Sequence, residues 1–118
     1  LVANALGRFA LEVAAVVCKT GGVDKSAMGI APEDYVRPGQ FEAMCTPIAQ
    51  AEFLNRANTD FNVVVGLCVG HDSLFYRHCE APVTTLIAKD RALAHNPAGA
   101  VYCAEGYFKQ RLTSDGEV

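Results

Sequence analysis

The chain has 118 residues, of which 51% are hydrophobic and 19% are charged, a composition typical of one globular domain rather than a disordered or fibrous segment. Ten lysines and arginines against thirteen aspartates and glutamates leave a net charge of −3, so no basic excess exists to bind nucleic acid or an anionic membrane surface. No apolar run approaches the roughly 20 residues that cross a bilayer, and the first residues lack the pattern of an export signal. We therefore expect a cytoplasmic domain that binds neither nucleic acid nor membrane.

The N-terminal part of the chain is predicted to hold a helix followed by a buried strand. Residues 1–9 have apolar residues at close to helical spacing. Residues 12–18 (EVAAVVC) form a β-branched run typical of a strand, which a turn over residues 19–22 (KTGG) ends. Residues 23–44 contain prolines, glycines and mixed charges without a sustained period, so they predict a long surface excursion of the kind that carries function or partners.

The central part of the chain predicts a helix, a strand and a second helix. Thr46 can cap a helix with its hydroxyl, and a proline follows at the first helical position, so we expect a helix over 47–57 that Asn58 ends. The continuous apolar run 62–68 (NVVVGLC) is typical of a strand covered on both faces in a parallel sheet. Residues 71–73 are predicted to open a short helix that runs through about residue 78, with Asp72 or Ser73 able to cap it.

A third strand over 83–89 and a last helix over 98–112, opened by the pair Asn96-Pro97, complete the prediction before a polar tail. Alternating helices and buried strands indicate an α/β fold, in a three-layer, Rossmann-like arrangement with a small, mainly parallel sheet. Three strands are few for such a fold. We therefore expect further strands from upstream residues or from a second subunit in a homo-oligomer.

Cysteine and histidine residues gather where the predicted strands end. Cys18 and Cys68 are the last residues of two strands, whereas Cys45, His71 and His95 stand just before helices. In a parallel sheet these positions share the carboxyl edge, where ligands bind. Sulfur and imidazole are the ligands of zinc and of iron-sulfur clusters, so a metal site is predicted with the ligands Cys18, Cys45, Cys68 and His71.

Positive charge is expected at the same edge of the sheet. Helix N-termini and the basic side chains Lys19, Lys89 and Arg91 would lower the thiol pKa values and so favour thiolates. Lys89 and Arg91 are also predicted to bind a small anionic ligand, a phosphate or a carboxylate, together with these helix N-termini.

The remaining cysteines point to packing rather than to chemistry. Five cysteines at wide spacing argue against a complete disulfide framework, and no CxxC pair is present. Cys79 and Cys103 fall on predicted helices with apolar neighbours, so we expect them to be packed.

Two alternatives to a metal site remain open at this stage. The stretch 66–70 (GLCVG) has the form of a nucleophile elbow with Cys68 as nucleophile; Asp90 and His95 would be its acid and base, and His71 stands close by in the sequence. The other alternative is an interaction domain in which the cysteines are small buried hydrophobes.

Four stretches of this chain resemble an uncharacterised bacterial and archaeal family, the domain of unknown function 1847, which is cysteine-rich and proposed to bind metal. They are VCKTG at 17–21, CTPIAQAE at 45–52, GLCVGHDSLF at 66–75 and APVTTLIAKDRALAHNP at 81–97. Cys18, Cys45, Cys68, His71 and Asp72 match the family pattern, and the chain looks like the C-terminal part of a longer member. The resemblance implies a fold and a site but no substrate.

Overall fold

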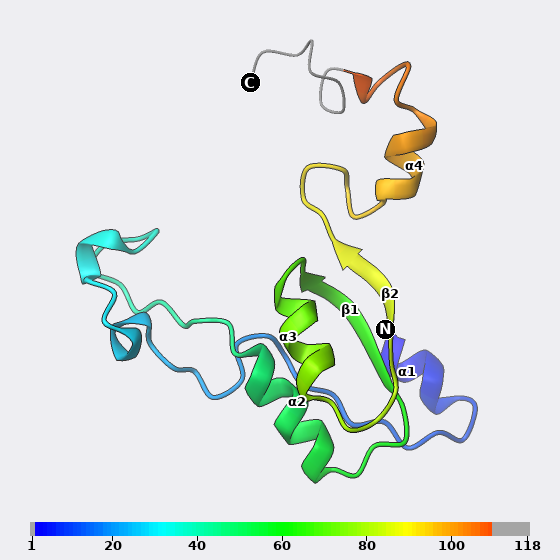
Figure 1. Cartoon of the computed structure of the whole chain (residues 1–118), viewed down its shortest axis with the longest axis horizontal. Helices are drawn as coiled ribbons and strands as arrows, with labels where there is room; N and C mark the ends of the chain where they lie inside the picture. The colour runs from blue at the N-terminus through cyan, green and yellow to red at the C-terminus, as the bar shows by residue number, and fades with distance from the viewer. Residues whose placement is uncertain (1, 110–118) are drawn as a thin grey trace.

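Helices and strands alternate in the computed structural model, which describes residues 2–109 (Figure 1). The elements are α1 (Val2–Gly7), two short 3-10 helices η1 (Lys25–Met28) and η2 (Pro32–Asp34), α2 (Pro47–Arg56), β1 (Asn62–Cys68), α3 (His71–His78), β2 (Val83–Lys89) and α4 (Pro97–Tyr102). The predicted strands 62–68 and 83–89 are confirmed to the residue, and the short helix predicted to end at about residue 78 is confirmed as α3. The α/β class is therefore confirmed at the level of its elements.

The sheet consists of β1 and β2, which pair in parallel with Asn62 opposite Val83 and Cys68 opposite Lys89. The carboxyl ends of these two strands therefore meet at one edge, as predicted. Helices α2 and α3 pack against each other and run opposite to the strands (Figure 1). Two strands and these helices do not make the expected three-layer, Rossmann-like arrangement within residues 2–109.

The strand predicted over 12–18 is wrong, because residues 11–17 have no regular structure. Only the end of the segment approaches the core: Val16 and Cys18 pack against it, while Val17 is 71% exposed and residues 11–15 are exposed as well. A strand is defined by hydrogen bonds to a neighbouring strand, and this segment pairs with neither β1 nor β2. Apolar content therefore predicted neither the pairing of this segment nor the exposure of its first residues.

The core lies between the two helices and the sheet. It consists of Ala51 and Leu54 from α2, Val64 and Leu67 from β1, and Phe75 from α3. Other large apolar side chains of the two strands remain exposed, namely Val63 and Val65 in β1 and Leu86 and Ile87 in β2. The expectation of strands covered on both faces is therefore wrong for this chain, because α2 and α3 both contribute to one core.

Gly66 interrupts the regular pairing of β1. The register shifts on both sides of Val65, and Gly66 has a φ of +69°. An unpaired residue in the left-handed region is typical of a β-bulge, which moves the following residues to the opposite face of the sheet. Val64 and Leu67, three residues apart, are therefore both buried, and Cys68 follows at the end of the strand.

Residues 23–44, which we call the lobe, project away from the helices and strands (Figure 1). The long excursion predicted here is confirmed. The ends of the lobe are joined by backbone hydrogen bonds from Lys25 N to the Glu42 carbonyl (3.1 Å) and from Met44 N to the Val23 carbonyl (2.9 Å). The lobe is thus closed at its base.

Asp24 organises the inside of the lobe. Its carboxylate accepts hydrogen bonds from the Tyr35 hydroxyl and from the backbone N–H groups of Ser26 and Glu42, both at 3.0 Å. The Tyr35 side chain is buried, and Lys25 forms an ion pair with Glu42 beside it. One aspartate therefore joins three separate parts of the lobe.

Helix ends follow the predictions in part. Asn96 caps α4 by accepting from Gly99 N (3.0 Å), which is confirmed, whereas the Thr46 hydroxyl does not cap α2. The cap predicted for α3 is wrong, because Gly70 rather than Asp72 or Ser73 is its N-cap; the Asp72 carboxylate accepts from Gly70 N (2.8 Å). Helix α4 ends at Tyr102, residues 103–108 form turns, and the predicted extension beyond residue 109 lies outside the described residues.

Over residues 2–109, none of the helices has the length and apolar character needed to span a membrane.

Candidate functional site

Two backbone segments that carry cysteines lie side by side at the base of the lobe. Thr46 N donates a hydrogen bond to the Cys18 carbonyl (2.8 Å), and the Thr46 hydroxyl donates to the Thr20 carbonyl (2.9 Å). This second bond is the reason why the hydroxyl does not cap α2. Cys18 and Cys45, which are far apart in the sequence, are thereby held on adjacent segments.

The Cys45 thiol is close enough to Cys18 and Cys68 to be influenced by both. The pKa of the Cys45 thiol is raised above its ordinary value, first by burial and then by the nearby thiols of Cys18 and Cys68. Lys19 opposes this shift more weakly. The prediction of a lowered pKa is therefore wrong for Cys45, because loss of water and neighbouring sulfurs outweigh the positive charge.

His71 follows Cys68 closely and opens α3. Its Nδ1 atom is buried and has no hydrogen-bond partner. A buried polar atom without a partner is unusual in proteins and is more often found where a ligand or water completes the environment. Within residues 2–109, however, no three histidine, cysteine or acidic side chains are arranged so that they could hold a metal ion as they stand.

The nucleophile elbow expected around Cys68 has a different geometry from the one predicted. Cys68 is part of β1 and pairs with Lys89, whereas Gly70, with a φ of +94°, occupies the turn before α3. In an elbow the nucleophile itself stands on the strained turn between strand and helix. The strained position here thus belongs to a glycine, two residues after the sulfur.

Asp90 and His95, the predicted acid and base, shape the loop that follows β2. Asp90 N donates to His95 Nδ1 (2.9 Å), and the Asp90 carboxylate accepts from Leu93 N (3.0 Å). His95 and Ala94 both have positive φ values, 57° and 55°. In the part of the chain that the structure describes, no hydrogen bond joins Asp90 or His95 to Cys68.

The two basic residues predicted to bind an anion differ in exposure. Lys89 is half-buried at the end of β2, opposite Cys68, whereas Arg91 is exposed. Only Lys89 therefore lies beside a predicted metal ligand.

The two other cysteines lie apart from the three-thiol cluster formed by Cys18, Cys45 and Cys68. Cys79 follows α3 and packs against the core, where burial raises the pKa of its thiol. Cys103 is exposed at the end of α4. The expectation of packing thus holds for Cys79 and not for Cys103.

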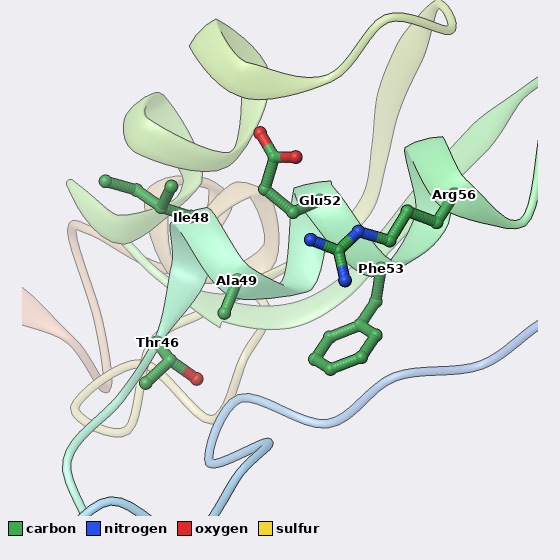
Figure 2. A pocket seen from close by; sticks show the side chains of 6 residues that line it. All are labelled: Thr46, Ile48, Ala49, Glu52, Phe53 and Arg56. Carbon is green, nitrogen blue, oxygen red and sulfur yellow. The ribbon is translucent and has the colours of Figure 1, made fainter.

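An open depression runs along the outer side of α2, as Figure 2 shows. Its volume is about 530 Å³, and it is lined by Thr46, Ile48, Ala49, Glu52, Phe53 and Arg56. No cysteine lines this depression. Its one link to the cysteines is Thr46, which lines it and is hydrogen-bonded to the backbone of Cys18 and Thr20.

Two polar features of the molecule were not predicted from the sequence. The first is the hydrogen bond between Asp24 and Tyr35 inside the lobe. Its sequence signal is limited to Asp24, a residue type that often caps helices and that here accepts a hydrogen bond from Ser26 N at the start of η1. Gln50, on the buried side of α2, is 6% exposed and its Oε1 atom has no hydrogen-bond partner. A glutamine in an amphipathic helix carries no signal that distinguishes it from an exposed one.

Residues 1–86 match the model of a family described as a protein of unknown function, DUF1847, so the chain belongs to this family. The match lies at the N-terminal end of this chain rather than at its C-terminal end. It includes Cys18, Cys45, Cys68 and His71 but ends before Lys89.

The chain is 50% identical over 101 residues to the uncharacterized protein MJ0455 of Methanocaldococcus jannaschii. This match covers 86% of the chain and 50% of that protein, so the chain spans about half the length of its curated relative. No solved structure matches the chain.

Proposed function

We propose that this domain binds a thiophilic metal, either a zinc ion or an iron-sulfur cluster, through Cys18, Cys45 and Cys68. The observation that carries the proposal is the interaction of the Cys45 thiol with both other thiols of the cluster. Three sulfurs near one another match the ligand preference of these metals. Because the thiols do not form a coordination shell as they stand, binding requires these side chains to turn towards a common ion.

The electrostatics of the cluster support a cation rather than an activated nucleophile. Neighbouring thiolates repel each other, which contributes to the raised pKa of Cys45. A metal cation stabilises each thiolate that it binds, so binding reverses this repulsion and releases protons. The position of Cys68 inside β1, away from the strained turn, also favours a ligand over an elbow nucleophile.

His71 is the fourth proposed ligand. Its imidazole stands three residues after Cys68, and its buried Nδ1 lacks a partner. Neutral imidazole is a common ligand of zinc and completes the four positions that a tetrahedral site requires. Bound zinc would stabilise the fold or act as a Lewis acid, and a cluster would transfer electrons.

An anionic ligand close to the metal is part of the same proposal. Lys89 lies opposite Cys68 at the carboxyl edge of the sheet and is half-buried there. An ammonium group in that position would attract a carboxylate or a phosphate. Arg91, which is exposed, would contribute from the following loop.

Metal analysis of protein purified without oxygen tests the proposal. We expect about one equivalent of zinc, or the iron and sulfide of one cluster, per chain after reconstitution. Cys68→Ser should lower this content several-fold, whereas Cys103→Ser, which changes an exposed thiol outside the cluster, should leave it unchanged. If wild-type protein and Cys68→Ser both retain less than about a tenth of an equivalent, the proposal is wrong.

A further inference from the structure

The base of the lobe brings two cysteine-bearing backbone segments together. The segments 18–20 and 45–46 are held side by side by two hydrogen bonds of 2.8 and 2.9 Å, both made by Thr46. A disulfide requires two cysteines on neighbouring stretches of backbone, with Cα atoms about 4.4–6.8 Å apart. Cys18 itself accepts one of these bonds through its carbonyl, and Cys45 directly precedes the residue that donates both.

We propose that Cys18 and Cys45 form a reversible disulfide that closes the base of the lobe and takes two thiols out of the three-thiol cluster. The disulfide itself depends only on the two adjacent segments. Its consequence, release of the metal, depends on the function proposed above. The pair would therefore make metal binding sensitive to peroxides and to thiol reductants.

The chemistry balances with a peroxide as oxidant. Hydrogen peroxide converts one thiol to a sulfenic acid and is itself reduced to one water molecule. The second thiol then attacks the sulfenic sulfur, the S–S bond forms and a second water molecule leaves. Two electrons pass from the two sulfurs to the peroxide, and a dithiol reductant reverses the step by thiol-disulfide exchange.

The other cysteines are less suited to pair with Cys45. Cys68 lies at the end of β1, whereas Cys18 lies on the segment to which Thr46, the residue after Cys45, is hydrogen-bonded. Cys79 packs against the core at the end of α3, and Cys103 is exposed at the end of α4. Among the five cysteines, Cys18 is therefore the one whose own backbone is held beside that of Cys45.

Disulfide mapping in the metal-free protein tests the pair. The positions of lysine and arginine place each cysteine on a different tryptic peptide: Cys18 on 9–19, Cys45 on 26–56, Cys68 on 57–77, Cys79 on 78–89 and Cys103 on 92–109. After treatment with hydrogen peroxide we expect a linked peptide of 9–19 with 26–56, which dithiothreitol separates. Linkage of 26–56 chiefly to 57–77, or no linkage to 9–19, would overturn the proposal.

A second measurement separates this proposal from the proposed function. Zinc-loaded protein is oxidised with peroxide in the presence of a chromophoric chelator, and we expect zinc release in step with the 18–45 linkage. Cys45→Ser should abolish the linkage, and Cys79→Ser should not change it. If the protein forms the 18–45 linkage but never binds zinc or a cluster, the disulfide proposal stands and the metal-binding proposal is wrong. If zinc is released without the linkage, the disulfide proposal is wrong.

Discussion

Asp24 shows how one half-buried carboxylate can hold a loop together. Its pKa is held well below the ordinary value, first by the Tyr35 hydroxyl and then by the backbone N–H groups of Ser26 and Glu42. The same hydrogen bond raises the pKa of Tyr35, because the phenol donates a proton that a phenolate lacks. Both shifts follow from the closed geometry of the lobe.

The ionisation of Tyr35 can be measured directly. We expect its phenol to titrate above the ordinary value of 10.0, and Asp24→Asn to move the titration back towards 10.0, since the charged acceptor is lost. The measurement is a spectrophotometric titration, with Tyr35→Phe used to assign the late transition. If Tyr35→Phe removes a transition at the ordinary pH instead, the hydrogen bond is not formed.

Acid is expected to open the lobe. The pKa of Asp24 is lower in the folded chain than in the unfolded one, so its contribution to stability is complete above the ordinary value of 3.8 and is lost as the pH falls below it. The amide of Glu42, which donates to Asp24, should therefore have a lower protection factor against hydrogen exchange at low pH. Hydrogen exchange measured by NMR checks this, and Asp24→Asn should remove the pH dependence.

At the scale of single elements, the bulge in β1 offers a clean test. A Cβ atom at Gly66 would meet no atom within 4 Å, so a substitution there is opposed only by the φ of +69°. Gly66→Ala should therefore destabilise the fold by about 1–2 kcal/mol in urea unfolding. Gly7→Ala, also in open space and without a positive φ, is the matched control and should be neutral or stabilising.

Some elements of the fold could be predicted from the sequence and others could not. β1 and β2 could be predicted to the residue, and α3 closely, because their apolar runs and flanking glycine or proline act locally. The strand at 12–18 could not, since its pairing depends on a neighbour that the sequence does not reveal. Thr46 failed as a cap for the same reason: its hydroxyl binds the carbonyl of Thr20, 26 residues earlier.

The candidate site could be predicted in part as well. The ends of parallel strands share one edge, which correctly brought Cys68 and Lys89 together. Cys18 reaches Cys45 by another route, through the hydrogen bond from Thr46 rather than through a strand. Burial decides the pKa of Cys45, and the sequence contains no information on how deeply a single thiol is buried.

For the molecule as a whole, the three-thiol cluster is in contact with the core through Cys18. Cys18 packs against the cluster of buried residues that includes Phe75, which is 4% exposed. Phe75→Ala should cost about 3–5 kcal/mol and also increase the rate at which iodoacetamide alkylates Cys18. Phe53→Ala, at a 47% exposed position on α2, is the matched control and should change both values little. Equal alkylation rates in the two variants would show that the thiol does not depend on the core.

The closed base of the lobe also has a practical consequence. Val36 and Phe41, which lie between Tyr35 and Glu42 in the lobe, are 83% and 68% exposed, while the bonds that anchor the lobe lie at Asp24, Glu42 and Met44. Material added between residues 36 and 41 is therefore attached outside these anchors. A fluorescent label or an affinity peptide inserted there would provide a handle for surface immobilisation, with the sulfur atoms at Cys18 and Cys45 left in their native surroundings.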